Sequence, residues 1–129
     1  MRKDFGDSDL EAQFDLVWNA LPQDVRDGLQ AELRLVTDKY EECEVTGYID
    51  KHPELDAVTY SERGNVDIYL DAPSLEEHED KAQFVIAREL ARIHLGNVPT
   101  LRSIQLTHSN EEQHFDLAED WGFSYGEGY

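Results

Sequence analysis

The N-terminal third of the chain spaces its apolar residues as amphipathic helices do. Ser8-Asp-Leu-Glu11 has the spacing of a helix-capping box. Apolar residues follow at helical intervals: Leu10, Phe14, Val17, Trp18 and Leu21. A second stripe comes after Pro22, a residue suited to a first helical turn: Val25, Leu29, Leu33, Val36 and Tyr40. We therefore expect two helices whose apolar stripes pack in a core, which is more common at this period than a partner-binding groove.

The period changes after Cys43, and short strands are expected. Val45–Ile49 predicts one strand. Ala57–Tyr60 and Val66–Leu70 flank Gly64 and its neighbours, a turn that suits a β-hairpin. Alternation within the last strand places Val66, Ile68 and Leu70 on one face, with Asp67 and Tyr69 on the other.

Two more helices are expected in the last third of the chain. Ser74–Glu77 is a second capping box and predicts a helix to about Leu95, ended by Gly96. Its expected core stripe is Ala82, Ile86, Leu90 and Ile93, and the adjacent face holds Val85, Arg88, Glu89 and Arg92. Ser109–Glu112 predicts a short last helix, and residues 122–129 are expected to fray. The pattern predicts a single α+β domain over residues 1–129: two N-terminal helices, a short three-stranded sheet, a long helix and a C-terminal helix.

Length and composition suggest a cytoplasmic protein. The chain has 129 residues, enough for one domain with a modest core. No apolar run reaches the roughly 18 residues that a membrane span needs, and the start does not resemble a secretion signal. Cys43 is the only cysteine, which excludes an intrachain disulfide and fits a reducing compartment. We expect no membrane partner, and the oligomeric state stays open.

The chain is strongly acidic. It has 29 acidic and 11 basic residues, for a formal net charge of -18, so ordinary nucleic-acid binding is not expected. Three interpretations compete: a solvated surface, adaptation to high salt, and mimicry of a nucleic acid. We favour the first because acidic residues are spread over all the expected helices, although composition alone does not separate the first two.

One segment has the layout of a metallopeptidase motif with its metal ligands replaced. In H-E-x-x-H, two histidines one helical turn apart bind zinc and the glutamate activates water. Here the segment reads Arg88-Glu-Leu-Ala-Arg92, so Glu89 is kept and both histidine positions are arginine. A guanidinium stays protonated and has no lone pair to donate, so it cannot bind zinc.

The surrounding sequence resembles the zincin-like metallopeptidases of the minigluzincin type. The resemblance covers roughly residues 44–123 and rests on four stretches: 68–73, 82–87, 88–96 and 112–123. It implies a zincin-like fold with Glu89 at the general-base position and Arg88 and Arg92 at two former ligand positions. Glu112 falls at the third-ligand position, with Glu111 or Glu119 as alternatives.

Other histidines do not restore a zinc site in this interpretation. His94 should point away from the Arg88 and Arg92 face, because two helical positions rotate it by about 200°. His114 could approach the former site, whereas His78 is almost three turns before Arg88. We expect each lone histidine, His108 included, to lie at the surface or cap a helix. We also expect zinc to be absent and no other cofactor to be bound.

A different role is therefore open for the two arginines. They could form an ion-pair cluster that replaces the metal, with Glu89 pairing to Arg92 at i,i+3 and Glu112 or a neighbour tying the two helices together. The alternatives are that both arginines point into solvent, or that they bind an anion such as a peptide carboxylate. The resulting expectation is a non-catalytic protein that binds or regulates an unknown protein partner. A metal-dependent peptidase with non-standard ligands and an acidic nucleic-acid mimic are the other possibilities.

Overall fold

The fold combines helices with one mixed sheet, as the sequence pattern predicts. The computed structural model describes residues 1–6, 9–39, 56–62, 64–75, 79–100 and 111–124. Within these ranges there are five helices and four strands: β1 (Arg2–Asp4), α1 (Leu10–Ala20), α2 (Gln23–Glu32), β2 (Leu33–Thr37), β3 (Ala57–Glu62), β4 (Asn65–Leu70), α4 (Ala72–Leu75), α5 (Glu79–His94) and α6 (Glu111–Asp120). The α+β class is confirmed, and the expected three-stranded sheet is corrected to four strands.

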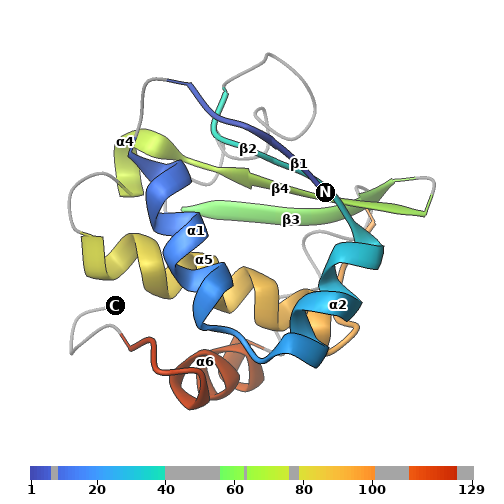
Figure 1. Cartoon of the computed structure of the whole chain (residues 1–129). Helices are drawn as coiled ribbons and strands as arrows, with labels where there is room; N and C mark the ends of the chain where they lie inside the picture. The colour runs from blue at the N-terminus through green and yellow to red at the C-terminus, as the bar shows by residue number, and fades with distance from the viewer. Residues whose placement is uncertain (7–8, 40–55, 63, 76–78, 101–110, 125–129) are drawn as a thin grey trace.

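The four strands form one sheet with an antiparallel edge. Their order is β1-β2-β4-β3, where β1, β2 and β4 run parallel and β3 runs antiparallel to β4. Helices α1, α2 and α5 lie against one face of the sheet, and α6 packs on α5 on the side away from the strands (Figure 1). Helix α5 is therefore enclosed between the sheet, α1 and α6.

The prediction that the second helix runs to Tyr40 is wrong. Helix α2 ends at Glu32, and the chain continues directly into β2. A β-bulge between Leu33 and Leu35 lets Leu33 and Val36 face the same side of the sheet, where each is at most 2% exposed. Their three-residue spacing therefore imitates a helical stripe. Tyr40 and the expected strand 45–49 lie outside the described residues.

The predicted hairpin is confirmed, but its polar face is buried. Strands β3 and β4 pair from Ala57↔Leu70 to Glu62↔Asn65, and Gly64 in the turn has a φ of 82°. Asp67 and Tyr69, on the face that alternation sets opposite Ile68, are only 2% and 5% exposed. Arg34 on the neighbouring strand binds the Asp67 carboxylate through two nitrogens, which supplies this buried acid with a counter-charge.

The long helix ends where the sequence predicts, but it starts later. A four-residue helix, α4, precedes α5, so the segment expected to begin at Ser74 is divided in two. At the C-terminal end, Gly96 adopts a φ of 75° and its N–H donates to the carbonyl of Ile93, while the Asn97 N–H donates to Arg92. These two bonds form a Schellman cap. All four residues of the predicted core stripe on α5 are at most 1% exposed.

Helix α6 ends in the same kind of cap. Gly122 has a φ of 98°, and the N–H groups of Gly122 and Phe123 donate to the carbonyls of Glu119 and Ala118. Phe123 joins the apolar core. Residues 122–124 of the tail expected to fray are thus described, and 125–129 lie outside the described residues. Among the described helices, none combines the length and apolar character that a membrane crossing would need.

Candidate functional site

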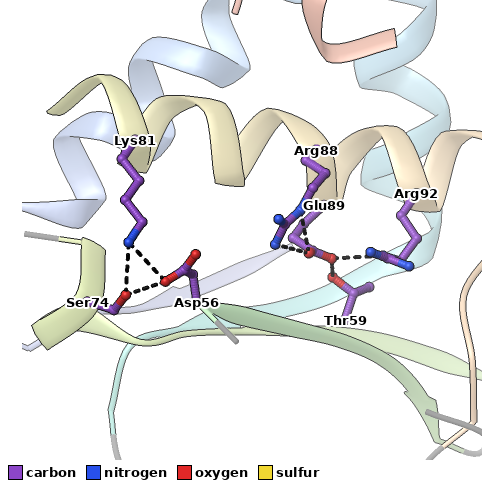
Figure 2. A network of polar contacts seen from close by, with 7 residues as sticks. All are labelled: Asp56, Thr59, Ser74, Lys81, Arg88, Glu89 and Arg92. Carbon is purple, nitrogen blue, oxygen red and sulfur yellow. Dashed lines mark hydrogen bonds and ion pairs between the residues drawn. The ribbon is translucent and has the colours of Figure 1, made fainter. Parts of the chain in front are cut away.

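The two motif arginines and the glutamate between them are buried together. Helix α5 places Arg88, Glu89 and Arg92 on its side toward the sheet, next to Thr59 of the edge strand β3 (Figure 2). Arg88 is 7% exposed, Glu89 1%, Arg92 6% and Thr59 3%. The alternative in which both arginines point into solvent is therefore wrong. We call these four residues the arginine–glutamate cluster.

Both carboxylate oxygens of Glu89 accept hydrogen bonds from this cluster. Arg88 donates to Oε1 from Nη2 at 3.0 Å and from Nε at 3.3 Å. Arg92 Nε donates to Oε2 at 3.0 Å, and the Thr59 hydroxyl donates to the same oxygen at 2.6 Å. The predicted i,i+3 pair between Glu89 and Arg92 is confirmed. The cluster thus joins α5 to itself and to β3.

The surroundings of Glu89 hold it in its ionised form. Burial by itself raises the pKa of this carboxyl, but the charges of Arg92 and Arg88 and the Thr59 hydrogen bond outweigh burial and lower the pKa to about 2. A carboxylate this weakly basic takes up few protons near pH 7. It is poorly suited to general-base catalysis, for which a pKa near the working pH is best.

Arg88 also contacts the last helix. Its guanidinium carbon lies 5.9 Å from the ring centroid of Phe115 on α6, within cation–π range. The Phe115 ring packs in turn against Phe84 of α5, with the centroids 5.5 Å apart. Arg88 is therefore connected to α6 through an aromatic contact.

The predicted third position does not face the cluster. Glu112, the first choice, is exposed on α6, and so is its alternative Glu119. The proposed tie between helices through Glu112 is therefore wrong, because the apolar face of α6 packs on α5 and turns this residue outward. Glu111 belongs to α6, but its side chain lies outside the described part of the chain, so that alternative stays a prediction.

The surface position predicted for His94 is confirmed, and the one predicted for His114 is wrong. His94 is exposed at the end of α5, at the surface as expected, with its ring centroid 6.1 Å from that of Trp121. His114, predicted at the surface or as a cap, is instead fully buried, with Nε2 3.1 Å from Asn97 Nδ2. His78 and His108 lie outside the described residues. Within the described ranges, no group of three or more His, Cys, Asp or Glu side chains is placed to hold a metal ion.

A second polar cluster, which sequence reasoning missed, lies on the same side of α5. Ser74 of α4 donates its hydroxyl to Asp56 Oδ1, and Lys81 Nζ lies 3.2 Å from that oxygen and 3.3 Å from Ser74 Oγ (Figure 2). One signal was available in the sequence. Lys81, Arg88 and Arg92 are seven and four positions apart, so three cations share one helix face in a chain that has few of them.

Replacing Arg88 with Ala is expected to lower the free energy of unfolding by about 2 kcal/mol. The variant loses hydrogen bonds to a buried carboxylate and the contact with the Phe115 ring. Urea unfolding followed by circular dichroism measures the change. Arg2→Ala is the matched control, since the Arg2 side chain is 75% exposed in its 3.5 Å pair with Asp4 and should change the value by less than about 0.5 kcal/mol. An unchanged Arg88→Ala midpoint would show that the cluster is not structural.

Comparisons of the chain with protein-family models, with curated proteins and with solved structures find no match. The family resemblance therefore rests on the motif residues and their order along the chain.

Proposed function

We propose that this chain is a non-catalytic, zincin-like protein in which the arginine–glutamate cluster takes the place of a metal centre. In this proposal it acts by binding or regulating a protein partner. The observation that carries it is the state of Glu89. The residue at the general-base position is buried, and both of its oxygens are hydrogen bonded to side chains at or beside the former ligand positions.

Peptide hydrolysis would require Glu89 to have different hydrogen bonding and a higher pKa. A metallopeptidase glutamate must have an oxygen free to take a proton from a metal-bound water. Here the same oxygens accept from Arg88, Arg92 and Thr59, and the pKa of Glu89 is lowered to about 2. Arg88 and Arg92 also bring positive charge where a ligand set would have to bind a cation. Both features support a structural use of the motif.

A partner-binding role agrees with the overall charge. A chain with a formal net charge of -18 associates most readily with a partner that presents a basic surface, because complementary charge speeds the encounter. A protein partner is favoured over a small anionic ligand, since the acidic surface repels anions on their way to the arginines.

The proposal is tested by metal binding in two proteins. The natural chain should contain less than about 0.1 zinc per molecule and should unfold at the same temperature with and without EDTA. Arg88→His/Arg92→His should unfold at a lower temperature without metal, because Glu89 loses its counter-charges, and zinc should restore much of the loss. Elemental analysis measures the zinc content of the natural chain. A thermal-shift titration with zinc sulfate measures the unfolding temperatures of both proteins.

Matched histidines elsewhere control for weak binding by any helical pair. Glu112→His/Asp116→His places two histidines at the same i,i+4 spacing on the exposed face of α6. If zinc raises the unfolding temperature of Arg88→His/Arg92→His no more than that of this control, the assignment of Arg88 and Arg92 to two former ligand positions is contradicted. Stoichiometric zinc in the natural chain, with a peptidase activity lost in Glu89→Gln, would contradict the non-catalytic role.

A further inference from the structure

Helix α6 carries acidic residues along its exposed face and around its C-terminal end. Glu112, Asp116 and Asp120 are exposed and four positions apart, and Glu119 is exposed beside the last of them. Residues at this spacing are neighbours on a helix, about 5–6 Å apart at Cβ, and like charges there weaken the helix. Its last turn contains no basic residue, so the acids there also oppose the helix dipole.

In the described part of the chain, most positive side chains form ion pairs away from this row. Lys3 pairs with Glu11 and Asp15. Lys39 pairs with Asp4, and Arg34 with Asp67. The cations on the sheet-facing side of α5 pair with Asp56 and Glu89. In these ranges positive charge thus serves mainly to hold strands and buried acids, and these ion pairs do not include the exposed acids of α6.

The opposite face of α6 is held by apolar contacts with α5. His114 and Ala118 are fully buried, and Phe115 packs on Phe84. A ten-residue helix is too short to be stable in water alone, so its existence depends on this packing. Packing and charge repulsion therefore act against each other within one element.

We propose that α6 is a salt-sensitive element, which stays docked on α5 when ionic strength screens its acidic row and opens more often when it does not. The screening length is about 30 Å at 0.01 M salt and about 3 Å at 1 M. The 5–6 Å spacing of the row lies between these lengths, so its repulsion is nearly complete at the lower concentration and strongly screened at the higher one.

Amide hydrogen exchange of the whole chain in 10 mM and 1 M KCl tests this inference. We expect the opening of α6 to be on the order of tenfold more frequent at 10 mM. This ratio corresponds to the summed repulsion free energies of two like-charge pairs and of the acids with the helix dipole. The amides of α5 should change much less. Asp116→Asn/Glu119→Gln/Asp120→Asn should remove most of the salt dependence of α6, because it removes both like-charge pairs of the row and the acidic charges of the last turn.

A second triple variant separates this local effect from total charge. Asp24→Asn/Asp27→Asn/Glu32→Gln neutralises three exposed acids on α2 and changes the net charge equally. It should leave the salt dependence of α6 in place. The inference is overturned if α6 exchanges equally at both salt concentrations, if α5 responds as strongly, or if the α2 variant removes the dependence as well as the α6 variant does.

Discussion

Glu89→Gln is expected to lower the free energy of unfolding by about 3–5 kcal/mol, a larger loss than that expected for Arg88→Ala. Removing one member of a buried ion-pair group leaves its partners without compensation, and this costs more than the pair itself contributes. In this case two guanidinium groups, 7% and 6% exposed as whole residues, would lose the carboxylate between them. Urea unfolding monitored by circular dichroism gives the value.

The control for this substitution is Glu112→Gln. It makes the same chemical change at an exposed glutamate of α6, where an effect within about 0.5 kcal/mol is expected. A loss below about 1 kcal/mol for Glu89→Gln would mean that the arginine–glutamate cluster contributes little to the fold. The structural replacement of a metal centre would then have no support.

Acid is expected to remove a comparable part of the stability through the same carboxyl. The pKa of Glu89 is lowered from 4.5 to about 2 in the folded chain. A lowered pKa stabilises the fold above the unfolded value, and this contribution is lost as the pH falls from about 5 toward 2. The shift corresponds to about 3 kcal/mol at neutral pH.

Subtracting the profile of Glu89→Gln isolates this titration from those of the many other acids. The difference in unfolding free energy between the natural chain and the variant should be constant above about pH 5 and should shrink as the pH falls toward 2. A difference that stays constant down to about pH 2 would show that Glu89 has an ordinary pKa. Urea unfolding at half-unit pH steps provides the profiles.

Sequence patterns within a few residues correctly predicted the hairpin and the end of α5. The hairpin follows from alternation and from a glycine that accepts positive φ, and the end of α5 follows from Gly96, which adopts the left-handed conformation of a Schellman cap. Both features depend on residues that lie close together in the sequence. The late start of α5 was missed because Ser74 has the spacing of a cap but its hydroxyl binds Asp56 instead.

The strands β1 and β2, which lie toward the other edge of the sheet, could not be predicted from such local patterns. Strand β1 has three residues and pairs in parallel with β2, whose partner positions lie 33 residues later in the chain, as in Arg2↔Leu35. Parallel pairing leaves no turn signal between partners. In β2, the bulge after Leu33 gives a buried strand the apolar spacing of a helix, so the period itself was misleading.

The site was partly predictable for the same reason. The pairing of Glu89 with Arg92 follows from helical spacing alone, whereas Thr59 reaches Glu89 only because β3 lies beside α5 in the fold. The expected tie through Glu112 was wrong because it depended on the rotation of α6 about its own axis, which is set by packing on α5. The burial of His114 depends on the same rotation.

The parallel order of the sheet also affects how the chain matures during synthesis. Strand β2 lies between β1, which precedes it in the sequence, and β4, which ends at Leu70. Helix α1 packs against α5, made still later, and Gln13 and Gln83 bond across that contact at 2.8 Å. During synthesis the N-terminal half therefore lacks both β4, the inner strand that pairs with β2, and α5, the helix that packs on α1. Until β4 and α5 have been synthesised, the apolar residues of the N-terminal half lack these packing partners, and the many negative charges help keep the incomplete chain in solution.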